Sequence, residues 1–321
     1  MSVPKITVLD GHTLNPGDLS WAPLAALGDV TLFERTPSEL VVERARDAEI
    51  VITNKVVISG AAMAQLAALR YIGVTATGTN IVDTAAARQR QIVVSNVPSY
   101  GADSVAEHTL SLMLEAAKHL GAHTAAVRAG AWARQPDFSF SVGEIRLLAQ
   151  RTLGIVGLGA IGRRVAELAR AFKMSILAAG RRGGSIPDVE GVRWCELGEL
   201  VERADFLSLH CPLSEQTQGL VDAALLARMR PQAVLINTSR GGLVDEAALA
   251  EALRAGRIAG AYLDVLSVEP PPLDHPLVGL PNCWITPHIA WASLEARTRL
   301  LEVSVENLRA FLAGKPRNVV T

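Results

Sequence analysis

Short runs rich in β-branched residues alternate with alanine-rich, proline-free stretches along almost all of the 321 residues. Because a helix between two strands returns the chain in the same direction, this alternation predicts βαβ units and parallel sheets. Five strands are expected at 6–9, 30–33, 50–53, 71–74 and 92–95. Six more are expected at 152–156, 176–179, 206–209, 233–237, 259–263 and 284–286. We therefore predict an α/β protein with two Rossmann-like or flavodoxin-like, doubly wound parallel-sheet domains.

The expected C-terminal helix, over 292–312, has apolar residues at helical spacing and follows the last strand of the second sheet. It is expected to return to the first sheet. The domains are then residues 1–100 with 290–321, and an inserted domain of residues 101–289. Two such crossings of the chain make a hinge, and we expect a ligand cleft between the two domains.

The amino-acid composition argues against several classes of binding partner. Lys and Arg number 31 against 32 Asp and Glu, and aromatic residues make up only 4%. These values argue against a broad cationic face for nucleic acid or anionic lipid and against base-stacking platforms. No run approaches the roughly 18 apolar residues of a membrane span. The three cysteines, which form no CxxC pair, predict neither disulfides nor a metal site. The N-terminus lacks the apolar core of a secretory signal, so we expect a cytoplasmic enzyme without nucleic-acid, membrane or metal partners.

The strand expected at 152–156 runs directly into a glycine-rich turn of the GxGxxG type. One apolar face of a helix follows it. In this context Gly157 permits the tight turn, Gly159 lets the backbone approach a pyrophosphate, and Gly162 allows close packing of helix and strand. We interpret the turn as a dinucleotide-binding site rather than a structural turn. Its candidate residues are Gly157, Leu158, Gly159, Ala160, Ile161 and Gly162.

The residues at the end of the next expected strand indicate which of the two nicotinamide dinucleotides binds. NAD-binding turns place a carboxylate there, about 20 residues on, to bind the ribose 2′-hydroxyl. This chain has Arg181 and Arg182 instead. Guanidinium groups can bind a 2′-phosphate, which a carboxylate would repel. We therefore expect NADP(H) to be preferred, with NAD(H) possible.

Three further chemical groups follow strands of the second sheet. Arg240 comes after the strand at 233–237, Glu269 follows the strand at 259–263 by a short loop, and His288 follows the last strand. An arginine can hold a carboxylate and polarise its carbonyl, and a histidine can transfer a proton. A neighbouring glutamate would orient that histidine and stabilise its charged form.

Together these segments resemble the D-isomer-specific 2-hydroxyacid dehydrogenase family over nearly the whole chain. The matching segments are GIVGLGAIG, INTSRGGLVDE, AGAYLDV, the Glu269-Pro270 pair and TPHIAW, in the family's order and approximate spacing. The resemblance implies reduction of a small 2-oxo acid to the D-2-hydroxy acid by hydride transfer from NAD(P)H. It implies that Arg240 binds the substrate, that His288 is the general acid/base and that Glu269 is its partner. It also makes 101–289 the dinucleotide-binding domain and the other domain the substrate-binding (catalytic) one.

The resemblance implies further contacts to both ligands. The additional cofactor candidates are His210, Cys211, Pro212, Thr217, Thr238, Ser239, Asp264, His288 and Ala290. Asp264 is similar to a residue on the nicotinamide-ribose side. The substrate candidates are Asn54, Val74, Thr75, Ala76, Thr77 and Gly78, with Arg240 and His288. A structural role for His210 is favoured over catalysis, while Trp291 fits either a pocket wall or simple packing.

Residues 53–55, 73–78 and 132–140 look closest to the glycerate dehydrogenase or hydroxypyruvate (glyoxylate) reductase branch. The long helix expected from Asp103 to about His119 has an apolar spread wider than one core face requires. In this family the corresponding region is similar to a dimer interface, so a homodimer is expected, with burial inside the domain as the alternative. Its histidines are then expected at the surface or an interface.

Two other functions remain open. A same-fold enzyme could oxidise another small anion, such as phosphite, although Glu269 disfavours formate because formate enzymes of this fold carry Gln beside the histidine. A nucleotide-sensing binding or scaffold protein with incidental turnover is the second alternative, because a fold alone does not establish a function.

Overall fold

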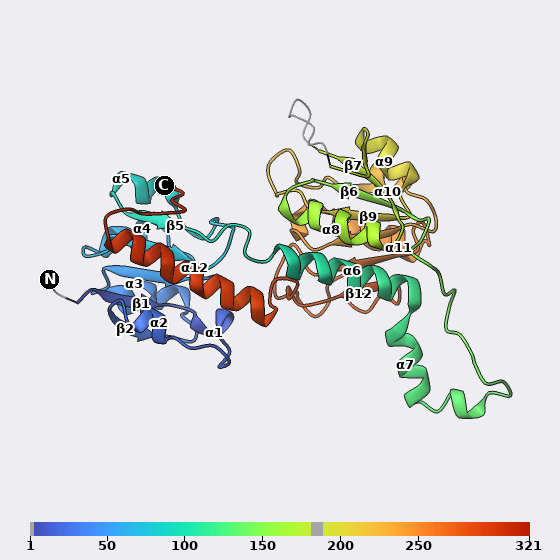
Figure 1. The fold of residues 1–321 in the computed structure, drawn as a ribbon, viewed down its shortest axis with the longest axis horizontal. Helices are drawn as coiled ribbons and strands as arrows, with labels where there is room; N and C mark the ends of the chain where they lie inside the picture. The colour runs from blue at the N-terminus through green and yellow to red at the C-terminus, as the bar shows by residue number, and fades with distance from the viewer. Residues whose placement is uncertain (1–2, 181–188) are drawn as a thin grey trace. The chain divides into compact units, whose positions relative to one another are not determined.

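The computed structural model describes residues 3–180 and 189–321, and the chain forms two compact units (Figure 1). The first comprises Met1–Gly101 and Ala292–Thr321, and the second comprises Ala102–Trp291. The chain therefore passes from one unit to the other twice.

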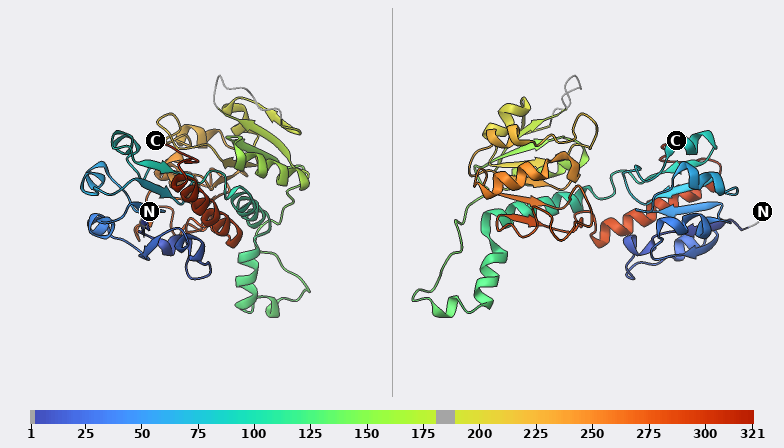
Figure 2. Two further views of the ribbon diagram at one scale, coloured as in Figure 1. Left: turned by 60° about the vertical axis from the view of Figure 1, so that its left-hand side comes forward. Right: turned by 180° about the vertical axis from the view of Figure 1, so that it is seen from behind.

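The first unit is built on a five-stranded parallel sheet in the order β2–β1–β3–β4–β5, the flavodoxin-like order. Its strands are β1 (Lys5–Val8), β2 (Asp29–Leu32), β3 (Ile50–Thr53), β4 (Tyr71–Val74) and β5 (Val93–Ser95). Its helices are α1 (Gly11–Leu14), α2 (Ala22–Ala25), α3 (Val41–Ala45), α4 (Gly60–Gln65), α5 (Thr84–Gln89) and α12 (Leu294–Leu312). Helix α12 lies along this sheet, as Figure 2 shows, and contacts β4.

The second unit contains a seven-stranded parallel sheet in the order β12–β11–β10–β9–β6–β7–β8. Its strands are β6 (Thr152–Val156), β7 (Ser175–Ala179), β8 (Val192–Trp194), β9 (Phe206–Leu209), β10 (Val234–Asn237), β11 (Gly260–Leu263) and β12 (Cys283–Ile285). The parallel α/β class is confirmed. The expected count of six strands is wrong, because β8 is an edge strand of only three residues and too short for a recognisable pattern.

Helices cover both faces of this sheet, and each face has its own apolar core. Helices α6 (Ala102–Lys118) and α8 (Ala160–Ala171) lie side by side on one face (Figure 1). On the other face are α9 (Leu197–Arg203), α10 (Ala223–Arg228) and α11 (Glu246–Arg254). The strands are buried on both faces, which explains their continuous apolar runs. The loops at the strand ends are therefore attached to a rigid platform.

Apolar side chains of helix α6 pack inside the second unit. Val105, Leu112 and Met113 are buried, the last two in the core beside α8. Helix α7 (Leu120–Arg128) follows, has no buried residue, and extends away from the rest of its unit (Figure 2).

Candidate active site

All strands of the second sheet run in one direction, so the loops after them meet at one edge. The order of the strands reverses between β6 and β9, which are neighbours in the sheet. In open α/β sheets this switch point is where a crevice for ligands forms. The candidate residues after β6, β9, β10, β11 and β12 therefore belong to one carboxyl edge, on either side of the switch point.

The three glycines of the turn after β6 have different surroundings, which give a different physical reason for each of them. Gly157 has a φ of +96°, and a Cβ there would lie 2.7 Å from the Cys211 nitrogen. A Cβ on Gly162 would lie 2.2 Å from the carbonyl oxygen of Gly157. A Cβ on Gly159, in contrast, would meet no atom of the described residues within 4 Å. Open space therefore lies beside the backbone at Gly159 alone of the three.

Helix α8 begins at this open space. Its N-cap is Gly159, no side chain caps it, and Ala160 and Ile161 form its first turn. The first N–H groups of a helix have no partner within the helix, and they carry partial positive charge. An uncapped helix N-terminus with open space before it fits the pyrophosphate of a dinucleotide. The buried Leu158 packs beneath the turn in the α6–α8 core. Arg181 and Arg182 lie outside the described residues.

The loop after β9 contains residues suited to structure rather than to proton or group transfer. The His210 Nε2 lies 2.8 Å from the Ser208 hydroxyl, and burial lowers the pKa of His210 to about 4. Burial also raises the pKa of the Cys211 thiol, which opposes thiolate formation. The Cys211 carbonyl accepts a hydrogen bond from Ser239 Oγ, and Thr217 Oγ1 donates to the Pro212 carbonyl. The Ser239 contact connects the loops after β9 and β10.

His288 and Glu269 are hydrogen-bonded to each other within the second unit. The His288 Nδ1 lies 2.6 Å from Glu269 Oε2, while Glu269 Oε1 accepts the Leu266 N–H at 3.0 Å. Both side chains are partly exposed, at 24% and 35%. Nδ1 facing a carboxylate carries the proton of that bond, so Nε2 is the nitrogen left to exchange a proton with a ligand. The arrangement is that of an oriented general acid or base.

Arg240 is exposed at the end of β10. Its carbonyl accepts a hydrogen bond from Asn237 Nδ2 at 2.8 Å, and its Nη1 donates to the Ser239 carbonyl at 2.7 Å. Thr238, two residues earlier, contacts Thr109 of α6 through their hydroxyls at 3.1 Å. The backbone carrying this guanidinium is therefore fixed while the side chain remains at the surface of its unit.

Asp264, after β11, is 1% exposed and turned toward the loop that carries His288. Its carboxylate accepts the N–H groups of Ile289 and Ala290 at 2.9 and 2.8 Å, and the Thr286 hydroxyl at 2.5 Å. Thr286 is a contributor that sequence reasoning missed, because nothing in the pattern TPHIAW distinguishes its hydroxyl from that of any threonine. His108 is a second. Its side chain is 19% exposed and contacts Thr286 within its own unit, which corrects the expected surface or interface position.

The substrate candidates of the first unit follow β3 and β4. Asn54 is buried, and its Nδ2 donates to the carbonyl of Thr75, which is also buried. Val74 ends β4, and Ala76, Thr77 and Gly78 form the loop after it. The Thr77 hydroxyl donates to the Val97 carbonyl at 2.9 Å.

A buried carboxylate fixes the start of the Asn54 loop. Asp10 accepts the N–H groups of Asn54, Lys55 and Val56 at 2.8, 2.6 and 3.1 Å. Sequence reasoning did not single it out. Its position directly after β1, at the same sheet edge as the substrate candidates, is the only signal that could have identified it.

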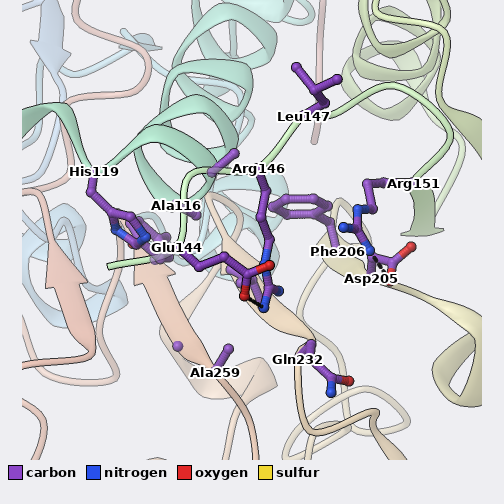
Figure 3. A pocket seen from close by; sticks show the side chains of 14 residues that line it. Ala116, His119, Glu144, Arg146, Leu147, Arg151, Asp205, Phe206, Gln232 and Ala259 are labelled. Carbon is purple, nitrogen blue, oxygen red and sulfur yellow. Dashed lines mark hydrogen bonds and ion pairs between the residues drawn. The ribbon is translucent and has the colours of Figure 1, made fainter. Parts of the chain in front are cut away.

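A separate pocket of about 140 Å³ lies at the opposite edge of the second sheet (Figure 3). It is lined by the first residues of β9, β10 and β11, which are Phe206, Val234 and Gly260. Its charged groups are paired: Arg146 with Glu144 at 2.5 Å and Arg151 with Asp205 at 3.8 Å. The pocket contains none of the candidate residues, so we do not assign it to the active site.

Among residues 3–180 and 189–321, no three His, Cys, Asp or Glu side chains are grouped to hold a metal ion. Within the same part of the chain, every helix is too short or too polar to cross a bilayer.

Known proteins of one family are similar to this chain. Residues 110–290 match the family described as "D-isomer specific 2-hydroxyacid dehydrogenase, NAD binding domain". The chain is 42% identical to a hydroxypyruvate reductase of Blautia hydrogenotrophica, over 98% of this chain and 99% of that protein. It is 41% identical to a glycerate dehydrogenase of Methylorubrum extorquens, over 89% of both. Among solved structures, it is similar to an NADPH-dependent glyoxylate/hydroxypyruvate reductase of Sinorhizobium meliloti in complex with citrate. That similarity has a TM-score of 0.85 and 30% identity, over 99% of this chain and 98% of that one.

Proposed function

Because the chain belongs to the D-isomer specific 2-hydroxyacid dehydrogenase family, we propose that it reduces a small 2-oxo acid, hydroxypyruvate or glyoxylate, with NADPH. The product is the D-2-hydroxy acid. The observation that carries the proposal is the His288–Glu269 pair, which lies at the carboxyl edge of a sheet whose switch point has an uncapped helix and an open glycine turn. The names of the relatives in Blautia and Methylorubrum support this substrate class.

The bound nicotinamide supplies or accepts the hydride. Within the second unit, Arg240 holds the substrate carboxylate. His288 Nε2 donates a proton to the carbonyl oxygen as the alkoxide develops, and neutral His288 accepts it in the reverse direction. Glu269 fixes the ring and stabilises the imidazolium through Nδ1.

The decisive experiment is a rate panel on the purified chain. We expect hydroxypyruvate and glyoxylate to be reduced faster than pyruvate or bulkier 2-oxo acids, with the D-enantiomer as product. Phosphite with NADP⁺ tests the alternative anion in the same assay. If no 2-oxo acid is reduced while nucleotide still binds, the binding-protein alternative replaces this proposal.

The same panel, run with NADPH and NADH, tests the cofactor preference. No carboxylate follows β7 before Arg181 and Arg182, and the Sinorhizobium relative is named as NADPH-dependent. We expect a lower KM for NADPH than for NADH. Replacing both arginines by alanine should raise the NADPH KM about 10–100-fold, because charged hydrogen bonds to the 2′-phosphate are lost, and leave the NADH KM nearly unchanged. An NADH KM equal to or below that for NADPH in the unmodified chain would refute the preference.

Two of the three glycines of the turn distinguish a cofactor role from a packing role. The Gly159→Ala variant should keep its thermal stability, because the new Cβ meets no atom in the part of the chain that the structure describes, and should bind NADPH at least about 10-fold more weakly. The Gly162→Ala variant should lose stability without any cofactor, because its Cβ would overlap the Gly157 carbonyl. Thermal melts without nucleotide, paired with NADPH titrations, check both. Unaltered NADPH affinity in Gly159→Ala would place the cofactor elsewhere.

We also propose a homodimer, with a different basis from the one the sequence indicated. Leu112 and Met113 of α6 are buried in the α6–α8 core, whereas Leu120 of α7 and Trp132, Phe138 and Leu147 in the segment after α7 are 51–91% exposed. A second copy of the chain would cover such a surface. Light scattering should give about twice 34.1 kDa, and a monomeric mass would reject the proposal.

A further inference from the structure

Helix α6 contributes polar side chains to the loops that carry the candidate catalytic residues. Ser104 Oγ donates to the Ala290 carbonyl at 2.6 Å, and His108 Nε2 lies 3.1 Å from Thr286 Oγ1. Ser104 and His108 are four residues apart and therefore lie on one face of the helix. One helix face thus contacts both ends of the segment 286–290, which has His288 at its centre.

The hydrogen bonds around Thr286 determine where the protons are. Both oxygens of Asp264 accept backbone N–H groups, which is the pattern of an ionised carboxylate and acceptor only. The single Thr286 proton therefore points to Asp264 Oδ1, at 2.5 Å. The lone pairs of Thr286 Oγ1 must then accept from His108, so His108 Nε2 carries a proton. The same nitrogen lies 3.6 Å from Asp264 Oδ1. The direction of donation runs from His108 to Thr286 to Asp264.

This series of hydrogen bonds, from His108 through Thr286 to Asp264, supports the backbone at His288. His288 has a φ of +55°, in the left-handed region that non-glycine residues rarely adopt. Such a conformation persists only where the surroundings hold it. The His288 N–H donates to the Asp264 carbonyl at 2.8 Å, and the next two N–H groups donate to the Asp264 carboxylate. Asp264 therefore holds His288 and the two residues after it.

We propose that His108 and Thr286 are positioning residues for the reduction. By fixing the Asp264 carboxylate, they hold the His288 backbone so that its ring faces Glu269 and its Nε2 faces the substrate. This inference rests on the proposed function of His288 as the proton donor, and it adds a helix residue and a hydroxyl that act on His288 through Asp264.

Paired variants test the two residues. Thr286→Val keeps the shape and removes the hydroxyl, while Thr286→Ser restores it. His108→Leu removes the donor, while His108→Gln supplies an amide N–H. We expect Thr286→Val and His108→Leu to lower kcat about 10–100-fold, because a small displacement of a proton donor is costly, with little change in the NADPH KM or in Tm. Thr286→Ser and His108→Gln should recover most of that loss.

Thr298→Val is the matched control. Thr298 is half-buried on α12 of the first unit, where its hydroxyl donates to the Leu294 carbonyl, so this variant loses a hydroxyl that has no part in the contacts around Asp264. Its kcat should equal that of the unmodified chain. Full kcat in both Thr286→Val and His108→Leu would overturn the inference while leaving the proposed function intact.

A second measurement does not depend on turnover. Proton–nitrogen NMR of the chain labelled at its histidines, with His108 and His288 assigned from variants, reports which ring nitrogens are protonated. We expect a proton on His108 Nε2, and a His288 Nδ1 signal that changes in Thr286→Val. A His108 Nε2 without a proton, or a His288 signal indifferent to Thr286→Val, would overturn the inference. A chain that reduces no 2-oxo acid yet shows both expected signals would refute the proposed function, while the support of the His288 backbone by His108 and Thr286 would stand.

Discussion

Replacing His288 by alanine is expected to lower kcat for 2-oxo acid reduction by about 10²–10⁴-fold, the range that general acid–base catalysis contributes. The imidazole is the group that Glu269 orients at 2.6 Å, and removing it leaves the developing alkoxide without a positioned proton donor. The hydride donor and its binding turn are untouched. We therefore expect NADPH affinity in His288→Ala to stay within a few-fold of the unmodified value, as measured by fluorescence titration.

His210→Ala is the matched control for this loss. His210 lies at the same sheet edge, but burial lowers its pKa to about 4, so it cannot deliver a proton near neutral pH. Its replacement should change kcat far less than that of His288, whatever it does to stability. Near-normal kcat in His288→Ala would show that the proton comes from another donor, and the assignment would be wrong.

Glu269→Gln separates the role of the charge from that of the hydrogen bond. Reduction needs His288 protonated, so its rate is high at low pH and falls as pH rises and the imidazolium loses its proton. Glutamine can still accept from Nδ1 but no longer stabilises the positive charge. The falling limb of the pH–rate profile should therefore move to lower pH in Glu269→Gln. A limb that stays in place would show that the carboxylate charge has no influence on the proton donor.

The parts of the fold that the sequence predicted are those where periodicity is long or chemistry is distinctive. The strands at 152–156 and 206–209 were predicted to the residue, because buried parallel strands are continuous apolar runs with polar boundaries. Strand β8 and helix α7 were not predicted. Residues 192–194 are too few for a period, and α7 has no buried face to impose one.

The candidate site likewise contains residues that the sequence predicted and residues that it did not. Arg240, Glu269 and His288 were predicted as candidates because each follows a strand and each has a side chain whose chemistry can be recognised from the residue type. His108 and Thr286 were not, because their importance lies in a contact between residues 178 positions apart, which no local pattern encodes. The sequence also could not decide whether the apolar side of α6 forms a dimer interface or is buried inside the domain, because a buried leucine and an interface leucine look the same in a sequence. The structure places Leu112 and Met113 in the core of the second unit.

The backbone beside Arg240 closely approaches the segment that leads to Glu269 at Gly241, which leads to the other large effect we expect. A Cβ on Gly241 would lie 1.9 Å from the carbonyl carbon of Leu266 and 2.2 Å from the nitrogen of Ser267. Both are backbone atoms of the segment that leads to Glu269. That segment is fixed on its other side, since Glu246 accepts the Ser267 N–H at 2.7 Å. Neither loop can retreat without breaking contacts that hold a candidate catalytic residue.

Gly241→Ala is therefore expected to lower the free energy of unfolding by about 1–3 kcal/mol, as overpacking does, and Tm by several degrees. Its kcat should also fall at least about 10-fold, because the Arg240 and Glu269 loops must separate for the methyl group to fit. The neighbouring Gly242→Ala is the control. Its Cβ would meet only the ends of the Leu213 side chain, at 3.1 and 3.3 Å, and those can rotate away. Urea unfolding and steady-state rates on both variants decide the matter. If Gly241→Ala matches Gly242→Ala in stability and kcat, the two loops are not coupled at this position, and the glycine between them serves neither packing nor catalysis.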